Sequence, residues 1–315
     1  MDYVLGIDGG GTTTVCVLMR GKDRVLGRGL AGASNYHNMG IEGAFNSIRL
    51  AVLQAISEAG VNPEIRAICL GMAGVSRPED FQVIHNLVQQ LQVPDCLPLK
   101  WSLHPNGLTI CSDSEIALVA GTGHKHGIVA IAGTGSIVFG RNPQGQTKRV
   151  GGWGPLLGDD GSAYQIAVLG MRAALQSEDG LLGDTVLKQS LIECIGIKSI
   201  KDLVQSIDRS DWDIQNIAAL APIVDRAAAA GDKVAKRIID QAVQSFVEAT
   251  RVAIETLFSY EAAFEVVTMG SVWQGHSGMR QQFESTIKAL APNTRIILPQ
   301  HESAYGAGLL ALGAL

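Results

Sequence analysis

The sequence predicts an α/β fold built from two similar halves, and three observations support this. Three short strand patterns joined by glycine turns open the chain, and helix and strand patterns then alternate. The same order begins again near Ile128. After Gly161, a block of amphipathic helical patterns precedes the last strands. At 315 residues the chain is also too long for one ordinary core and suits two domains.

In the first half, strand patterns are expected at 3–7, 13–19, 25–30, 67–70 and 108–111. The first three are joined by short glycine-bearing turns, which favours antiparallel pairing of consecutive strands. Helices are expected at 41–59, where Gly60 is a typical stop, and at 80–91.

The second half repeats this style with helices inserted. Strands are expected at 128–132, 136–141, 264–268 and 295–298. Helices are expected at 163–175, 184–194, 214–230, 233–258, 279–290 and 303–312. We therefore predict an N-terminal domain over 1–116 and a C-terminal domain over 117–301, with a helical insertion at about 160–260. The last helix, within 302–315, is expected to pack back on the first domain.

Composition narrows the function classes. A net charge of -5 and a pI near 5.8 argue against nucleic acid as the main partner. The five cysteines are dispersed, which indicates reduced thiols and weighs against a zinc or iron–sulfur site. Neither a signal peptide nor an apolar run of membrane-spanning length is recognisable, so we expect a cytoplasmic protein without a membrane partner.

The first strand runs directly into a glycine-rich turn, Asp-Gly-Gly-Gly-Thr-Thr-Thr at 8–14. Glycines let backbone N–H groups approach phosphate oxygens, because no Cβ stands in the way, and threonine hydroxyls add donors. We expect phosphate contacts from Gly10, Gly11, Thr12 and Thr13. Asp8, at the strand end, is the candidate ligand of a hydrated Mg²⁺ ion. A plain hairpin turn is the alternative interpretation.

A second strand runs into Gly133-Thr134-Gly135, a second candidate phosphate turn. A P-loop is excluded, because no glycine–lysine pair is followed by Ser or Thr. A dinucleotide fingerprint is disfavoured, because the third glycine is missing and the turn leads into another strand. The similar Gly121-Thr-Gly123 follows a helical pattern and suits a helix stop. Two phosphate turns suggest a nucleotide held between the two halves.

Six motifs, taken in order, resemble the N-acetylglucosamine kinases of the BadF/BadG/BcrA/BcrD ATPase family, in the actin/chaperone/sugar-kinase superfamily. They are Asp8-Gly-Gly-Gly-Thr12, Ser112-Asp113, Ala132-Gly-Thr-Gly-Ser136, Gly151-Gly-Trp-Gly154, Gly158-Asp-Asp-Gly-Ser162 and Met269-Gly-Ser-Val-Trp273. The match spans nearly the whole chain. The resemblance implies two ribonuclease-H-like domains with ATP and Mg²⁺ in the cleft, and a homodimer.

Asp113 is the candidate catalytic base. It follows an apolar strand, so it should project from the sheet edge, where open α/β sheets bind ligands. The matching aspartate is the base in the resembled kinases, and a positioned base typically contributes about 10²–10⁴-fold in rate. A helix N-cap is the structural alternative, and Ser112 could cap equally well.

The acceptor sugar is expected to meet a second set of residues. Trp153, flanked by Gly152 and Gly154, suits a wall against the apolar face of a sugar ring, although a buried core tryptophan is the alternative. The resemblance adds the sugar ligands Asn35 and Asp159, together with Thr134 and Gly135. Ala73 stands where the animal N-acetylglucosamine kinases have serine, which leaves the details of acceptor recognition open.

For the adenosine side, Gly270 and Ser271 follow a strand, and small residues there would let a purine lie against the backbone. Ala218, Ala219 and Pro222 are expected to form the opposite wall. Close packing of helix on strand is the alternative for all of them.

We predict an ATP-dependent kinase that transfers the γ-phosphoryl group to the 6-hydroxyl of N-acetylglucosamine. Glucosamine, N-acetylmuramic acid and N-acetylmannosamine are alternative acceptors, because related kinases share these motifs. An activating ATPase for a redox enzyme is disfavoured by the dispersed cysteines. A sugar-binding regulator without activity is disfavoured by the retained Asp8, Asp113 and both turns.

Overall fold

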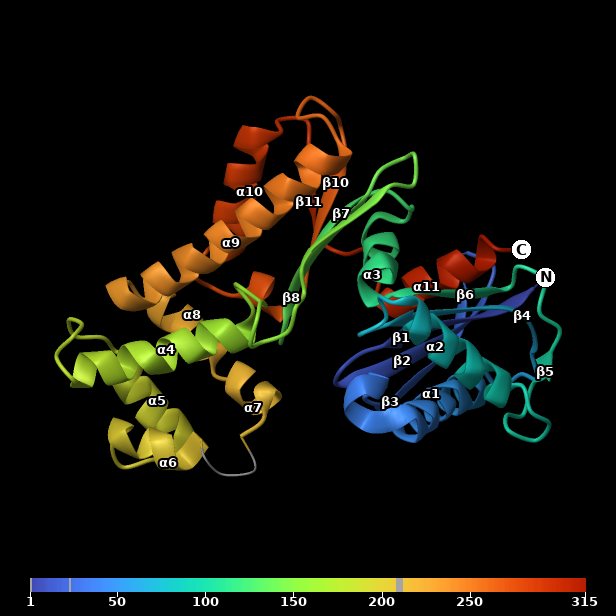
Figure 1. Ribbon diagram of the computed structural model, residues 1–315, viewed down its shortest axis with the longest axis horizontal. Coiled ribbons are helices and arrows are strands. Elements are labelled where there is room, and N and C mark those ends of the chain that lie inside the picture. Colours follow the sequence, from blue (N-terminus) through green and yellow to red (C-terminus); the bar gives the residue numbers. More distant parts are fainter. Residues whose placement is uncertain (1, 23, 208–211) are drawn as a thin grey trace. The chain divides into compact units, whose positions relative to one another are not determined.

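The computed structural model describes residues 2–22, 24–207 and 212–315 (Figure 1). The chain divides into two compact units, one containing residues up to His126 together with Pro299–Leu315, the other Gly127–Leu298. The predicted boundary at 116/117 is wrong, because it would cut the helix α3 (Asp113–Thr122). This helix packs against the C-terminal helix α11 (Ser303–Leu312), and so belongs to the first unit.

The first unit is built on a mixed sheet. Its strands are β1 (Tyr3–Gly9), β2 (Thr13–Arg20), β3 (Val25–Gly32), β4 (Glu64–Met72), β5 (Lys100–Trp101) and β6 (Leu108–Ser112). Their order is β3-β2-β1-β4-β5, and β6 also pairs with β4. The predicted antiparallel pairing of the first three strands is confirmed, and β4 runs parallel to both β1 and β6.

Helices cover both faces of this sheet. Alternate residues of β1 enter two cores: Leu5 and Ile7 pack with α1 (Tyr36–Ala59) and α2 (Pro78–Leu91), while Val4 packs with α3 and α11. In Figure 1, α1 and α11 accordingly lie on opposite sides of the blue strands. Gly60 ends α1 in the left-handed conformation, as predicted, and the non-helical Gly40, with φ of 71°, separates the helix expected at 41–59 from a short preceding turn that Asn35 caps.

The helix α11 approaches the sheet at backbone distance. A Cβ added to Gly6 of β1 would lie 2.3 Å from the carbonyl oxygen of Ala304. One added to Gly306 would lie 2.1 Å from that of Ile116 in α3. Only glycine permits such contacts, so these two positions fix α11 against β1 and α3.

The second unit repeats the strand order of the first. Its strands are β7 (Gly127–Ala132), β8 (Ser136–Arg141), β9 (Thr147–Gly151), β10 (Glu265–Met269) and β11 (Arg295–Ile297). The order β11-β10-β7-β8-β9 has the same directions as β6-β4-β1-β2-β3, which confirms the predicted duplication and the α/β class. The strand β9 was not predicted, because adjacent charges in Thr-Lys-Arg-Val obscure its alternation.

Helices separate β9 from β10. They are α4 (Ala163–Glu178), α5 (Leu187–Ile195), the 3₁₀ helix η1 (Ile200–Asp202), α6 (Leu203–Ile207), α7 (Ile214–Ala218), α8 (Ala221–Ala229) and α9 (Lys233–Leu257). After β10 come the 3₁₀ helix η2 (Ser271–Gln274) and α10 (Met279–Leu290). The predicted single helix at 214–230 is wrong: Pro222 lies in the first turn of α8, where proline is tolerated, and a helix interior would not accept it.

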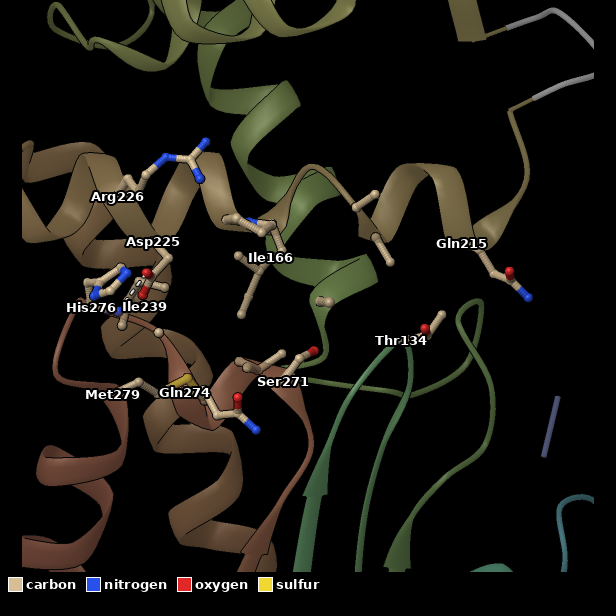
Figure 2. Close-up of a pocket in the computed structure, with 17 residues that line it drawn as sticks. Thr134, Ile166, Gln215, Asp225, Arg226, Ile239, Ser271, Gln274, His276 and Met279 are labelled. Atoms are coloured by element: carbon tan, nitrogen blue, oxygen red, sulfur yellow. Dashed lines mark hydrogen bonds between the residues drawn. The ribbon is translucent and has the colours of Figure 1, made fainter. Parts of the chain in front are cut away.

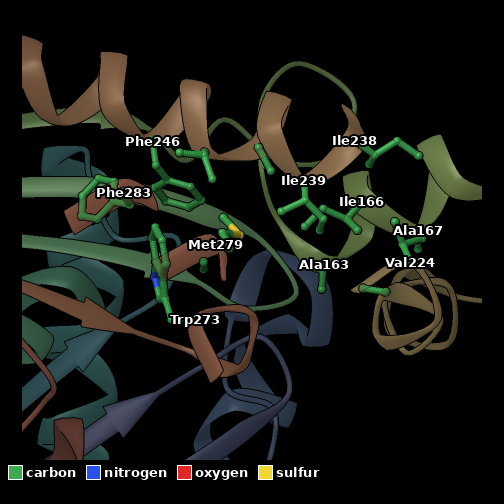
Figure 3. Packing of buried hydrophobic residues seen from close by; sticks show 14 of the residues in the cluster. Ala163, Ile166, Ala167, Val224, Ile238, Ile239, Phe246, Trp273, Met279 and Phe283 are labelled. Carbon is green, nitrogen blue, oxygen red and sulfur yellow. The ribbon is translucent and has the colours of Figure 1, made fainter. Parts of the chain in front are cut away.

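An aromatic cluster supports this unit. Trp273 donates a hydrogen bond from Nε1 to the carbonyl oxygen of Ala130 at 2.9 Å. Its ring centre lies 4.7 Å from that of Phe246 and 4.9 Å from that of Phe283 (Figure 3). The end of η2 is therefore anchored to β7. Across the described part of the chain, every helix is too short or too polar to cross a bilayer.

Candidate functional site

The glycine turn between β1 and β2 is held by its carbonyl groups. The N–H of Gly10 donates to the carbonyl of Thr13 at 2.9 Å, while the carbonyl of Gly10 accepts from the N–H groups of Ser34 and Asn35 at 3.0 and 3.3 Å. A Cβ added to Gly11 would meet no atom within 4 Å, and Gly11, Thr12 and Thr13 are exposed. The turn thus presents its outer edge to a ligand and is tied by its inner edge to Asn35.

Two carboxylates lie at the same edge of the first sheet. In the strand register, Asp8 stands beside Gly71, and Gly71 stands beside Cys111, two residues before Asp113. Burial, followed by the nearby charges of Asp113 and Glu302, raises the pKa of Asp8 to about 7. This end of the sheet therefore concentrates negative charge next to the turn.

The geometry around Asp8 suits a magnesium ion. Mg²⁺ is usually held by one or two carboxylates, the substrate phosphates and water molecules. Asp8 supplies one carboxylate, and a cation there would relieve the repulsion that raises its pKa. Within the described residues, His, Cys, Asp and Glu form no group of three that could hold a metal without phosphate.

Asp113 is the first residue of α3, but it is not the cap. Ser112 is the N-cap, and its side chain accepts a hydrogen bond from the N–H of Glu115 at 3.3 Å. One carboxylate oxygen of Asp113 accepts from the N–H of Ser114 at 2.7 Å. The capping role thus falls to Ser112, and a half-buried carboxylate remains at the sheet edge.

Asn35 directly precedes a hydrogen-bond network around Asp80 that sequence reasoning missed. Asp80 is buried and accepts hydrogen bonds from the Tyr36 hydroxyl and from the N–H groups of Ser76 and Arg77, the latter two at 2.9 and 2.7 Å. The bond from Tyr36 is the largest influence holding the pKa of Asp80 down at about 2. Its carboxylate also lies 3.4 Å from Nε2 of His37. The only sequence signal was an aspartate in the first turn after Pro78.

The second glycine turn, between β7 and β8, is also held by its carbonyl groups. The carbonyls of Gly133 and Thr134 accept from the first N–H groups of α4, those of Ala163 and Tyr164, at 2.9 and 3.3 Å. A Cβ added to Gly135 would lie 2.9 Å from Oδ2 of Asp159. The structure therefore brings Thr134, Gly135 and Asp159 together.

Asp159 is tied to this turn and carries a strained backbone. Its φ is +57°, and its Oδ1 accepts a hydrogen bond from the N–H of Ser136 at 3.3 Å. Burial raises the pKa of Asp159, while the N–H groups of Ser136 and Gly154 and the charge of Arg149 act in the opposite direction. A strained, buried carboxylate beside a phosphate turn is typical of a functional position.

Trp153 is 67% exposed, which excludes the buried-core alternative for this side chain. The guanidinium carbon of Arg149 lies 4.9 Å from the centre of its ring, and Arg149 donates to the carbonyl oxygen of Gly152. A cavity of about 510 Å³ lies between this loop and α9. Trp153, Leu157 and Asp159 line it, together with polar residues of α9.

A second cavity, of about 400 Å³, collects most of the residues predicted for the adenosine side (Figure 2). Its lining includes Thr134, Ala218, Ala219, Pro222 and Ser271. In Figure 2, Thr134 and Ser271 lie below the helices that carry Ile166 and Arg226. Ile166, Ile239 and Met279 belong to both this lining and the core of Figure 3, so the cavity has an apolar wall.

Gly270 contributes differently from the prediction. It is not among the lining residues; its φ is +110°, and a Cβ there would lie 2.2 Å from the carbonyl oxygen of Ala132. The glycine thus lets the chain turn tightly after β10 and brings Ser271 to the cavity.

Further lining residues were missed from the sequence. They are Gln215, Asp225, Arg226, Gln274 and His276. The carboxylate of Asp225 accepts from the N–H groups of His276 and Ser277 at 2.7 and 3.0 Å, which ties α8 to the segment after η2. These hydrogen bonds join residues about fifty positions apart in the sequence, so no local pattern predicts them. The only sequence signal for the missed lining residues is that they lie close in the sequence to Pro222 and Ser271.

Comparisons with known proteins identify the family of this chain. Residues 5–311 match the BadF/BadG/BcrA/BcrD ATPase family. The N-acetylmuramic acid/N-acetylglucosamine kinase of Clostridium acetobutylicum is 31% identical over 312 residues, which are 99% of this chain and 98% of that protein. The N-acetyl-D-glucosamine kinase of Dictyostelium discoideum is 31% identical over 324 residues, again 99% and 98% of the two chains.

A solved structure from Chromobacterium violaceum, described as a candidate N-acetylglucosamine kinase, shares the fold. Its TM-score is 0.78 over 99% of each chain, at 24% identity. Because the family match covers nearly every residue and two relatives exceed 30% identity over the whole length, the chain belongs to the BadF/BadG/BcrA/BcrD ATPase family.

Proposed function

We propose that this protein is an ATP-dependent amino-sugar kinase that phosphorylates the 6-hydroxyl of N-acetylglucosamine. The observation that carries the proposal is the presence of Asp8 and Asp113 at one sheet edge, beside a glycine turn whose outer edge is exposed. Full-length relatives named as amino-sugar kinases support the choice of acceptor class.

In the proposed reaction, the sugar hydroxyl oxygen bonds to the γ-phosphorus of ATP. The bond from that phosphorus to the β–γ bridging oxygen breaks, and ADP leaves with the bond's electron pair. Asp113 accepts the hydroxyl proton, so the products are a sugar phosphate and ADP. Such transfers depend mainly on positioning and electrostatics, with one residue to orient the acceptor.

We assign phosphate binding to one glycine turn in each unit, and adenosine binding to the second unit. The turn at Gly10–Thr13 and the turn at Thr134–Gly135 would bind phosphates through backbone N–H and hydroxyl groups. The 400 Å³ cavity would take the adenosine between Ala218 and Ser271. Its size and mostly apolar lining with few polar groups are typical of small-molecule sites.

The same assignment gives Mg²⁺ to Asp8. The ion would neutralise phosphate charge that develops during transfer. Asp8 must be ionised to bind it, so its raised pKa predicts weaker activity below about pH 7 at limiting Mg²⁺. On the acceptor side, Asn35, the loop Gly152–Gly154 and Asp159 would hold the sugar.

An ADP-release assay tests the proposal. We expect MgATP-dependent turnover with N-acetylglucosamine, measured beside glucosamine, N-acetylmuramic acid and N-acetylmannosamine, and ³¹P and ¹³C NMR of the product to place the phosphate on O6. Asp113→Asn should fold and bind ATP normally but lose about 10²–10⁴-fold in turnover. Ser112→Ala, which removes the cap but not the base, is the matched control. Near-normal turnover by Asp113→Asn, or no activity with any amino sugar, would refute the assignment.

A further inference from the structure

A cation is fixed on the loop assigned to the sugar. Arg149 lies in β9 and places its guanidinium over the ring of Trp153, 4.9 Å from the ring centre. It also donates to the carbonyl oxygen of Gly152, which holds the side chain in place. A guanidinium has five N–H donors, so this bond leaves others to face a ligand. Both Arg149 and Trp153 are exposed.

The surroundings of Arg149 are acidic. Asp159 lies close enough for the Arg149 charge to favour its ionised form, and Asp160 follows directly. A neutral sugar needs no cation here, because carboxylates accept hydrogen bonds from hydroxyl groups. A sugar that itself carries a carboxylate would be repelled by Asp159 unless a positive charge stood beside it.

We infer that Arg149 recognises a carboxylate carried by the acceptor amino sugar. The planar fork of a guanidinium matches a carboxylate, and stacking on Trp153 orients that fork in advance. N-acetylmuramic acid, whose 3-O-lactyl group ends in a carboxylate, is the acceptor of this chemistry among those considered for this site. The guanidinium stacks on Trp153, which is one of the residues that line the 510 Å³ cavity. This inference rests on the proposed function.

The test compares two acceptors in one protein. For N-acetylmuramic acid and N-acetylglucosamine, kcat/KM is measured with the wild type, Arg149→Met and Arg149→Lys. Arg149→Met should lower the ratio of the two values, N-acetylmuramic acid over N-acetylglucosamine, on the order of ten- to a hundredfold, the usual loss for a charge-assisted hydrogen bond. Arg149→Lys should recover part of it, because the charge remains.

Two controls separate charge recognition from loop structure. Lys148→Met removes the same charge from the neighbouring position of β9, which faces the opposite side of the strand, and should leave the ratio unchanged. The methyl ester of N-acetylmuramic acid keeps the size of the substituent without its charge, so its kcat/KM should not depend on Arg149 beyond the change seen with N-acetylglucosamine.

Three results would overturn the inference. Arg149→Met could lower both sugars equally, which would make Arg149 a support of the Trp153 loop only. The ester could lose as much as the acid, which would make the effect steric. The wild type could phosphorylate N-acetylglucosamine but not N-acetylmuramic acid, which would leave the proposed function standing. Inactivity of the wild type with every amino sugar would instead refute the proposed function and this inference with it.

Discussion

The two glycine turns occupy the same place in sheets of the same strand order, yet only the first has a carboxylate at the end of the strand that precedes it. Asp8 and Gly9 end β1, whereas Ile131 and Ala132 end β7. In both turns carbonyl groups accept from N–H groups of a later segment of the same unit: Ser34 and Asn35 in one unit, the start of α4 in the other. The two turns therefore share this anchoring but differ in the source of their carboxylate: Asp8 belongs to the strand itself, whereas Asp159, beside Gly135, comes from a later loop.

Removing the carboxylate that distinguishes the first turn should have the largest effect. Asp8→Asn keeps the shape of the side chain but loses the charge that would hold Mg²⁺, so kcat/KM for MgATP should fall by at least about a hundredfold. Steady-state kinetics over a range of Mg²⁺ concentrations measure this. Full activity in Asp8→Asn would remove the distinction between the turns.

The same variant should be more stable than the wild type at neutral and alkaline pH. The folded chain holds the Asp8 proton up to about pH 7, whereas an unfolded chain releases it near pH 4, so wild-type stability falls as pH rises through this window. Asp8→Asn lacks that titration. Without Mg²⁺ it should gain about 1–3 kcal/mol at pH 8 and nothing below pH 4.

Urea unfolding at the two pH values measures the difference. A gain of equal size at pH 4 and pH 8 would show that burial of the charge is not its source.

Adding a methyl group should change different properties at the two turns: ATP binding at the first, and stability and sugar binding at the second. Gly11→Ala places its Cβ in open space, so stability should not change, but the group stands where a phosphate approaches, and KM for ATP should rise about tenfold. Gly135→Ala presses on Asp159, so it should cost about 1 kcal/mol of stability and weaken sugar binding. Thermal unfolding and KM values for both substrates separate the two outcomes. Matching profiles would mean that the turns are equivalent.

The smallest effect should come from the carboxylate that holds the acceptor segment of the first unit. Its pKa of about 2 means that Asp80 stabilises the fold above pH 4, and that this contribution is lost as pH falls toward 2. Asp80→Asn should cost about 1 kcal/mol at pH 7 and raise KM for the sugar more than KM for ATP. The matched variant Tyr36→Phe should do the same more weakly. A cost that persists at pH 2 would exclude the charge as its cause.

Sequence patterns predicted those parts of the molecule that depend on local chemistry. The expected helices at 279–290 and 303–312 coincide with α10 and α11, and Gly123 ends α3 as a helix stop. Both glycine turns were recognised because their composition is itself the signal. The motifs also identified Ser271 and Ala218, which the fold brings to one cavity.

What the sequence missed depends on contacts between distant residues. Asp225 ties α8 to a segment fifty residues later, and Asp80 meets Tyr36 across the gap between two helices. Pro222 is a local signal for a break between two helices, but the apolar periodicity on both sides of it led to the prediction of a single helix.

Because α11 contacts the backbone of β1, the first unit can be completed only after the second unit has been synthesised. The strands of the first unit are made before the second unit, but the helix α11 that covers them is made after it. The second unit is continuous in sequence and can finish folding while β1 still lacks that partner. A premature stop codon just before Ser303 would therefore leave a folded second unit joined to a sheet with one uncovered face, and a product prone to aggregate.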